Sequence, residues 1–231
     1  MSLRLAVFDM VGTTVEAGDE VPRSFREAFR RFGVELPDEA VKGVRGRSKE
    51  EAIATLIGAY LPREEDPRKT AREVYADFKE LVRSNYGSKP TPVAGATEVL
   101  EWLRKAGVKV VLTTGLDRET ANQIVRGLGW ESLRLSGLVA GDDVQHGRPA
   151  PDLIHTSMRR VGENDPKAVL TAGDTVSDLL AAVAAGVGWN VGVLTGAHSR
   201  ESMEARPHSV ILESLGDLPH WLEEVGALVV P

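Results

Sequence analysis

Short, uninterrupted apolar runs that end in polar or glycine residues recur along this chain and predict buried β-strands. The first covers residues 4–8 and leads directly into Asp9. After residue 93, five further runs follow, at 108–113, 137–140, 168–172, 189–194 and 209–212. A short continuous apolar run of this kind is typical of a strand that is buried on both faces of a parallel sheet.

Amphipathic helical patterns fit between these runs, at 95–106, 117–128, 152–162, 176–186 and 216–226. Strands that alternate with helices in this way build a parallel sheet with helices on both faces. We therefore predict an α/β fold, a Rossmann-like doubly wound parallel sheet.

The stretch between the first strand and the others has apolar residues at helical spacing and no strand-like run. It predicts three helices, at 22–32, at 49–60 and at 66–86. Ser48 is the expected N-cap of the second helix, and Glu51 is expected to complete a capping box. We expect a small all-helical cap inserted into the core, with the boundaries 1–16 (core), 17–90 (cap) and 91–231 (core).

Composition narrows the class of protein. The 231 residues are 42% hydrophobic and 27% charged, which is typical of a packed globular protein. The net charge of −6, with acids and bases interspersed, argues against a nucleic-acid or membrane partner. No cysteine is present, which excludes thiolate metal sites and a cysteine nucleophile. Because no apolar run reaches the roughly 18 residues of a membrane span and no signal sequence is visible, we expect a cytoplasmic protein.

Polar residues follow four of the predicted strands or lie in the loops after them. They are Asp9, the segment Thr113-Thr114-Gly115, Arg148 between Gly147 and Pro149, and the pair Asp174 and Asp178. In a doubly wound sheet the carboxyl ends of the strands meet at one crevice. Alone, each feature has an ordinary explanation as a turn residue, a helix cap or an answer to a helix dipole.

Together these residues form a coherent chemical set. Convergent carboxylates without cysteine or clustered histidine suit Mg²⁺. Thr113 offers a hydroxyl, Thr114 a backbone N–H, and Arg148 a planar fork of donors for phosphoryl oxygens. Such a set is suited to stabilising a phosphoryl group during transfer.

With these motifs the chain resembles a hydrolase of the haloacid dehalogenase (HAD) superfamily with a helical cap after the first strand. The resemblance implies that Asp9 attacks phosphorus and forms an aspartyl-phosphate intermediate. It implies that Thr113 and Arg148 bind the phosphoryl group, with substrate contacts from the neighbouring loop residues Gly12, Thr13, Thr114 and Gly115. It also implies a Mg²⁺ site made by Asp9, Asp174, Asp178 and the backbone carbonyl of Val11.

Two departures from the common pattern narrow the resemblance. Ordinary phosphatases of this superfamily have a second aspartate where Val11 stands, and losing that general acid should cost roughly 10²–10⁴ in rate. Arg148 stands where lysine is usual. Both departures resemble the phosphonoacetaldehyde hydrolase (phosphonatase) branch, whose cap lysine forms a Schiff base with the substrate aldehyde. Lys49 occupies the matching place, and an iminium there would let the carbon leave as an enamine.

Other interpretations of Lys49 stay open. It precedes Glu50 and Glu51, which would raise its pKa and make it a solvated surface lysine, or it contacts the substrate without a covalent bond. Arg45 stands where the phosphonatase branch has methionine. Arg45 or Arg47 would meet an extra anionic group on a different substrate.

The sequence therefore predicts a Mg²⁺-dependent, phosphonatase-like hydrolase that acts on a small phosphonate or phosphorylated metabolite. One alternative is a phosphomonoester phosphatase of the phosphoglycolate phosphatase type, and another is a non-catalytic phosphate-binding relative. Cap helices of the phosphonatase branch often form dimers, so Phe25, Phe29 and Phe32 are candidates for a homodimer contact as well as for the core of the cap.

Overall fold

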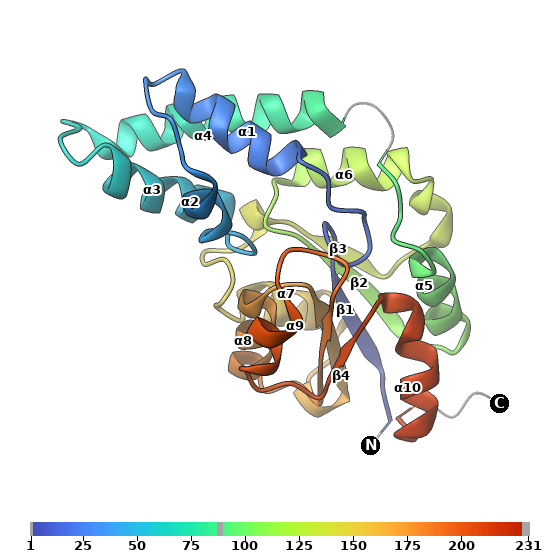
Figure 1. Cartoon of the computed structure of the whole chain (residues 1–231). Coiled ribbons are helices and arrows are strands. Elements are labelled where there is room, and N and C mark those ends of the chain that lie inside the picture. Colours follow the sequence, from blue (N-terminus) through green and yellow to red (C-terminus); the bar gives the residue numbers. More distant parts are fainter. Residues whose placement is uncertain (1, 87–89, 228–231) are drawn as a thin grey trace.

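The computed structural model describes residues 2–86 and 90–227 and contains a six-stranded parallel sheet (Figure 1). Its strands are β1 (Leu5–Asp9), β2 (Lys109–Thr113), β3 (Gly137–Val139), β4 (Val169–Gly173), β5 (Trp189–Val193) and β6 (Val210–Leu212). Their spatial order is β3-β2-β1-β4-β5-β6. Each predicted strand is confirmed, and β1 lies in the middle, paired with β2 and β4.

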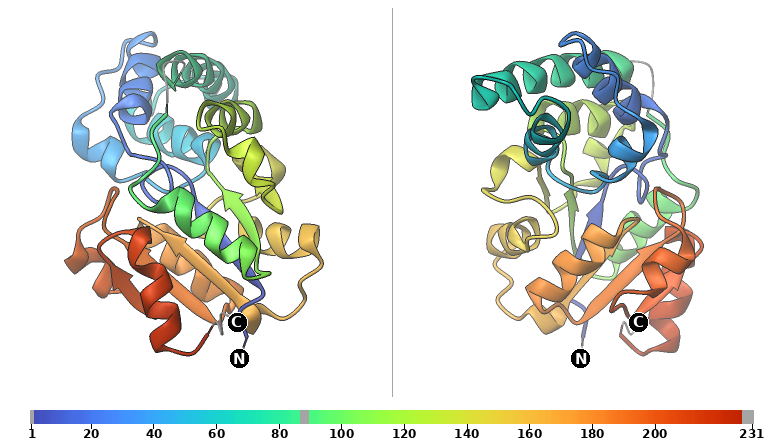
Figure 2. Two further views of the ribbon diagram at one scale, coloured as in Figure 1. Left: turned by 90° about the vertical axis from the view of Figure 1, so that its right-hand side faces the viewer. Right: turned by 60° about the vertical axis from the view of Figure 1, so that its left-hand side comes forward.

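Helices cover both faces of the sheet, as predicted (Figure 2). The core helices are α5 (Ala96–Lys105), α6 (Arg118–Gly127), α7 (Asp152–Val161), α8 (Val176–Ala185), α9 (Arg200–Glu204) and α10 (Leu218–Glu224). Alternate β1 side chains enter two separate apolar clusters. Leu5 and Val7 pack with residues of α7 and α8, whereas Ala6 and Phe8 belong to the cluster that includes α5 and α10. This period of two fixes which face each strand residue covers.

The insertion after β1 is helical and lies over the carboxyl ends of the strands (Figure 1). It comprises α1 (Glu20–Arg30), α2 (Asp38–Lys42), α3 (Lys49–Tyr60) and α4 (Pro67–Tyr86). The long helix α4 packs against α1 and α3, and the rings of Phe25 and Phe78 lie 4.5 Å apart between their centroids. The boundaries 17–90 remain a prediction, and Lys89 of the expected junction lies outside the described residues.

Two helices, α2 and α9, are absent from the sequence-based expectations. Each has five residues, and each buries a single apolar side chain, Val41 or Met203. A periodic pattern cannot be recognised over so short a segment.

The predicted capping box at Ser48 is wrong. Ser48 is the N-cap of α3, but its side chain accepts no capping hydrogen bond. The Glu51 carboxylate instead accepts a hydrogen bond of 3.2 Å from the backbone N–H of Gly147. Glu51 thus makes a hydrogen bond between the insertion and the core in place of the expected capping interaction with Ser48.

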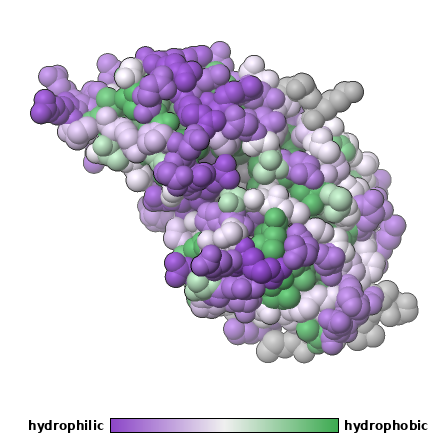
Figure 3. Space-filling view, in the orientation of Figure 1, coloured by the Kyte–Doolittle hydropathy of each residue, from purple (hydrophilic) through white to green (hydrophobic). Residues whose placement is uncertain are grey.

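The aromatic residues of α1 and of the turn that follows it pack into the interior of the insertion. Phe25 and Phe29 are buried, and Phe32 packs partly buried against the same cluster. Much of the surface over α1 and α4 is hydrophilic in the view of Figure 3. The homodimer remains a prediction. No helix in the described ranges is long and apolar enough to cross a membrane.

Candidate active site

The tip of β1 places Asp9 at the centre of the sheet edge, opposite Thr113 of β2. The chain then turns tightly, because the N–H groups of Thr13, Thr14 and Val15 all donate to the Met10 carbonyl at 2.8–3.1 Å. Gly12 sits within this turn with φ +97°, and a Cβ there would lie 2.4 Å from Asp174 Oδ2. The turn therefore needs glycine both for its backbone angle and for the approach of Asp174.

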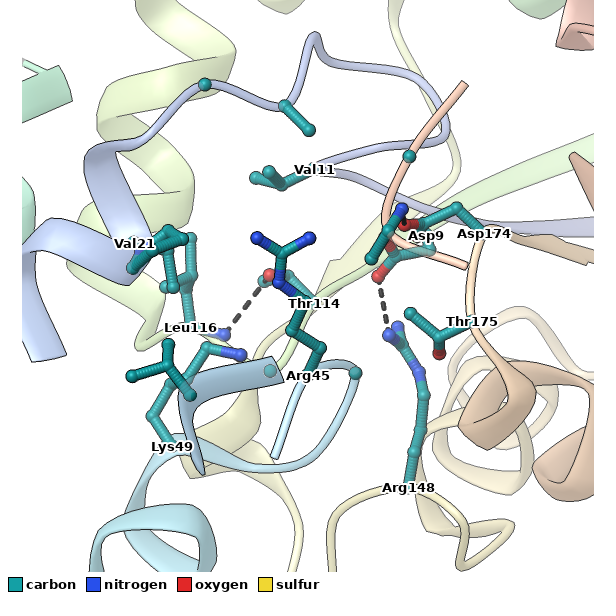
Figure 4. A pocket seen from close by; sticks show the side chains of 18 of the residues that line it. Asp9, Val11, Val21, Arg45, Lys49, Thr114, Leu116, Arg148, Asp174 and Thr175 are labelled. Atoms are coloured by element: carbon teal, nitrogen blue, oxygen red, sulfur yellow. Dashed lines mark hydrogen bonds and ion pairs between the residues drawn. The ribbon is translucent and has the colours of Figure 1, made fainter. Parts of the chain in front are cut away.

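A cavity of about 180 Å³ opens between this edge of the sheet and the cap. The core contributes Asp9, Arg148 and Asp174, and the cap contributes Arg45 and Lys49. Figure 4 shows Arg148 reaching toward Asp9, with Lys49 and Arg45 entering from the cap. The remaining wall includes the apolar residues Val11, Val21, Phe25, Val41 and Leu116. Five of the predicted charged residues thus converge on a small, partly apolar space.

Arg148 contacts three polar side chains of the core. Its Nη1 lies 2.6 Å from Asp9 Oδ1 and 2.9 Å from Asp178 Oδ1. Its Nη2 donates to the Thr113 hydroxyl at 3.0 Å. All four side chains are buried, so the guanidinium is held in one orientation with donors directed at the nucleophile candidate.

Thr113 at the end of β2 and Thr114 just after it have different surroundings. The Thr113 hydroxyl donates to the Phe8 carbonyl at 3.2 Å and accepts from Arg148, and Thr113 does not line the cavity. Thr114 and Gly115 do line it. The expectation that the Thr114 N–H is free for the phosphoryl group is wrong, because it donates to the Val139 carbonyl at 3.1 Å in the sheet. The Thr114 hydroxyl accepts a hydrogen bond of 3.1 Å from the Leu116 N–H.

The carboxylates at this edge repel one another. Burial raises the pKa of Asp174 to about 8, and the charges of Asp9 and Asp178 add to the effect. Burial also raises the pKa of Asp9 to about 6, although Arg148 acts in the opposite direction. A divalent cation between Asp9 and Asp174 would relieve this repulsion.

The oxygen donors of the site suit Mg²⁺ when water and substrate supply the remaining ligands. Among residues 2–86 and 90–227, no three acidic or histidine side chains are placed to hold a metal by themselves. Mg²⁺ commonly uses one or two carboxylates and takes its other ligands from water, carbonyls and substrate phosphates. Asp9, Asp174 and the Val11 carbonyl are therefore the groups that would hold it.

Asp178 is engaged by the protein. One carboxylate oxygen pairs with Arg148, and the other accepts hydrogen bonds from the N–H and hydroxyl of Thr175 in a true capping box of α8. Its predicted role as a direct metal ligand remains a prediction. The geometry supports a role in holding Arg148.

Lys49 is buried, with 8% of its surface exposed, so its interpretation as a solvated surface lysine is wrong. Its Nζ donates to the Arg47 carbonyl at 3.2 Å. Burial lowers the pKa of Lys49 to about 8, against the opposing influence of Asp9. The expected rise in this pKa from the neighbouring Glu50 and Glu51 is therefore wrong. The Glu51 carboxylate accepts a hydrogen bond from the Gly147 N–H instead.

The loop that carries Arg45 and Arg47 packs closely against the core. A Cβ on Gly46 would lie 2.3 Å from Thr175 Oγ1, and one on Gly115 would lie 2.6 Å from the Arg47 carbonyl oxygen. Arg47 does not line the cavity, and its Nη1 donates to the Thr55 hydroxyl at 3.4 Å. Of the two arginines predicted to contact substrate, the structure brings Arg45 to the cavity.

Contacts to Asp174 complete the site. The Ala197 N–H donates to Asp174 Oδ2 at 2.7 Å, and Thr13 Oγ1 lies 3.4 Å from Asp174 Oδ1. Gly12 and Thr13 therefore contact Asp174 rather than lining the cavity. The loop Thr195-Gly196-Ala197, which follows β5 at the same sheet edge, also lines the cavity.

Comparison with known proteins shows the family of this chain. The family model for haloacid dehalogenase-like hydrolases matches residues 3–186. A phosphonoacetaldehyde hydrolase of Bacillus cereus is 32% identical, over 98% of this chain and 90% of its own length. One of Bacillus cytotoxicus is 30% identical, over 93% of this chain and 84% of its own length. A solved hydrolase from Pseudomonas syringae has a TM-score of 0.85 at 22% identity, covering 96% of this chain and 99% of that chain.

Proposed function

Because the chain belongs to the haloacid dehalogenase-like hydrolase family, we propose that it cleaves the carbon–phosphorus bond of a small phosphonate bearing a carbonyl group. One observation carries the proposal. The Lys49 amine lies buried in the same cavity as the Asp9 carboxylate, with a pKa lowered to about 8. An amine of that pKa is partly free at neutral pH and can attack a carbonyl.

In the proposed reaction Lys49 condenses with the carbonyl and releases water, which gives an iminium two bonds from phosphorus. Asp9 then attacks phosphorus, and the electron pair of the C–P bond moves into the iminium to give an enamine. Water hydrolyses the aspartyl phosphate to phosphate and restores Asp9. Protonation of the enamine and hydrolysis of the resulting iminium release the carbonyl product and Lys49.

The site supports this route over ester hydrolysis. Val11 lines the cavity where an ester phosphatase of this family would place its proton donor, and its side chain cannot protonate an alkoxide. A carbon leaving as an enamine does not need that proton at the moment of bond cleavage. Mg²⁺ held by Asp9 and Asp174 would neutralise charge on the phosphoryl oxygens, while Arg148 orients them.

Reductive trapping tests the proposal directly. Protein is incubated with phosphonoacetaldehyde and sodium borohydride, and the modified peptide is located by mass spectrometry. We expect the adduct at Lys49, and we expect Lys49→Ala to abolish both the adduct and phosphate release. Lys42, an exposed cap lysine 2.8 Å from Glu39, supplies the control variant Lys42→Ala, which should behave like wild type.

The nucleophile is tested in the same experiment. Asp9→Asn should still form the imine but leave the C–P bond intact, so its trapped adduct should retain the phosphonate that wild type loses. Hydrolysis of p-nitrophenyl phosphate that survives Lys49→Ala, without any adduct, would instead indicate an ester phosphatase. Binding of phosphate without turnover of either substrate would indicate a non-catalytic relative.

A further inference from the structure

We infer that the substrate carries a second anionic group, a carboxylate attached to its carbonyl carbon, which Arg45 of the cap binds. The inference rests on the proposed function, because it concerns the organic end of the same phosphonate. It assigns the site to a 2-oxo-3-phosphono acid rather than to an aldehyde.

The position of Arg45 carries the argument. Its side chain lines the cavity together with Lys49, on the cap side (Figure 4). Within the described parts of the chain it has no carboxylate within ion-pair distance, whereas cap residues Arg26 and Arg30 are each within 3.0 Å of one. Arg45 is half-buried at the wall of a partly apolar cavity, and a guanidinium in such a place favours an anionic ligand.

The phosphoryl group already has its own cation on the opposite side. Arg148 enters from the core and lies against Asp9, where the phosphorus must be for attack. Arg45 enters from the cap, as does Lys49, which must reach the carbonyl carbon. A group bonded to that carbon therefore lies on the side of the cavity where Arg45 stands.

The backbone next to Arg45 is fixed against the core. Gly46 has φ +75°, and a Cβ on it would lie 2.3 Å from Thr175 Oγ1. The loop therefore approaches the core as closely as glycine allows. The backbone that follows Arg45 is thus packed against the core, which favours a specific contact with substrate.

The chemistry of cleavage is the same for the oxo acid. Its ketone is also one carbon removed from phosphorus, so condensation with Lys49 releases water and gives an iminium that accepts the C–P electron pair. The products are phosphate and a 2-oxo acid. A carboxylate in place of the aldehyde hydrogen adds three heavy atoms, and the adjacent cation lowers the cost of holding its charge.

The test compares 3-phosphonopyruvate with phosphonoacetaldehyde in phosphate-release kinetics on wild type and Arg45→Met. Wild type should prefer the oxo acid in kcat/KM. In Arg45→Met the ratio of kcat/KM for oxo acid over aldehyde should fall at least about tenfold, mainly through KM for the oxo acid. Arg63→Met, at an exposed cap position outside the cavity, should keep the wild-type ratio.

A measurement on wild type alone guards against a variant that fails to fold. Borohydride trapping at Lys49 should proceed at lower concentrations of pyruvate than of acetaldehyde, because only pyruvate carries the carboxylate. Preference for the aldehydes in both experiments, or an Arg45→Met ratio equal to wild type, would overturn the inference while leaving Lys49 chemistry intact. Absence of any Lys49 adduct with all four compounds would overturn the proposed function itself.

Discussion

The guanidinium of Arg148 lies 2.6 Å from the carboxylate of Asp9, so the proposed nucleophile is already ion-paired with the group that would orient the phosphoryl oxygens. The same guanidinium nitrogen lies 2.9 Å from Asp178. One buried cation therefore pairs with two buried carboxylates, in addition to its proposed role toward substrate.

Arg148→Ala should damage both turnover and stability. It removes the oriented phosphoryl contact, which should lower kcat roughly 10²–10³-fold. It also leaves Asp9 and Asp178 without their buried counter-charge, at a cost of about 3–5 kcal/mol in the free energy of unfolding. Phosphate release and urea unfolding measure the two effects.

The control for this variant is Arg160→Ala. Arg160 pairs with Asp143 at 3.2 Å, but the pair is half-exposed. Its loss should cost at most about 1 kcal/mol and leave turnover unchanged. Equal stability losses in the two variants would contradict the assignment of Arg148 as the buried counter-charge.

Thr113→Val should reveal a positioning residue. Valine keeps the volume but loses the hydroxyl that accepts from Arg148 at 3.0 Å. We expect kcat to fall about tenfold with little change in KM, since Thr113 does not line the cavity, and Thr113→Ser should restore kcat. A rise in KM alone would show that Thr113 contacts substrate directly.

Gly147→Ala should prevent the cap from packing on the core as closely as it does in this structure. A Cβ there would lie 2.3 Å from Ser48 Cβ and 2.7 Å from the Ser48 nitrogen, at the start of α3. The cap must shift outward, which moves Lys49 away from Asp9 and should lower kcat/KM by at least about tenfold. Steady-state kinetics and borohydride trapping measure the change.

Gly58→Ala is the matched control. Gly58 lies within α3, and a Cβ there meets no atom within 4 Å. Alanine should stabilise the helix by up to about 1 kcal/mol and leave kinetics unchanged. Wild-type kinetics in Gly147→Ala would mean that the cap does not need this approach during turnover.

The sheet could be predicted from sequence because its signals are local. Each strand is a continuous apolar run, and Asp9 and Asp174 follow such runs directly, so their convergence follows from parallel topology alone. The role predicted for the Thr114 N–H was wrong, because the sequence does not show which N–H groups at the end of a strand still pair in the sheet. Only the sheet pairing shows that the Thr114 N–H is already used.

The environment of Lys49 also depends on contacts that are distant in sequence. Its neighbours Glu50 and Glu51 indicated a solvated lysine with a raised pKa. Packing of the cap on Gly115 and Gly147 buries the amine and draws Glu51 toward the core. No pattern within the cap could reveal this, because the burial comes from loops roughly 70 to 100 residues further along the chain.

The pH dependence of imine formation follows from the pKa of Lys49. Only the free amine attacks a carbonyl, and a pKa of about 8 in place of 10.5 increases the free fraction at neutral pH roughly 300-fold. Borohydride trapping without metal should therefore rise with a midpoint near pH 8 and level off above it. A rate that continues to rise through pH 10 would indicate an amine with an ordinary pKa.

Because Lys49 is buried, it should lower the free energy of unfolding at neutral pH. The unfolded chain holds the lysine proton up to pH 10.5 and the folded protein only up to about 8, so the unfolded state binds more protons between these values. Wild-type stability therefore rises with pH across that window and is lowered most below pH 8. At pH 7, Lys49→Met should be more stable by about 2 kcal/mol, after allowing for the lost hydrogen bond to the Arg47 carbonyl.

Urea unfolding at pH 7 and at pH 10 tests this reasoning, because the advantage of Lys49→Met should shrink as pH rises toward 10.5. Other groups that titrate near pH 10 are common to both proteins and cancel in the difference. Lys42→Met, at an exposed cap position, should stay within about 0.5 kcal/mol of wild type at pH 7. A Lys49→Met protein that is less stable than wild type at both pH values would show that the amine contributes more through its contacts than its burial costs.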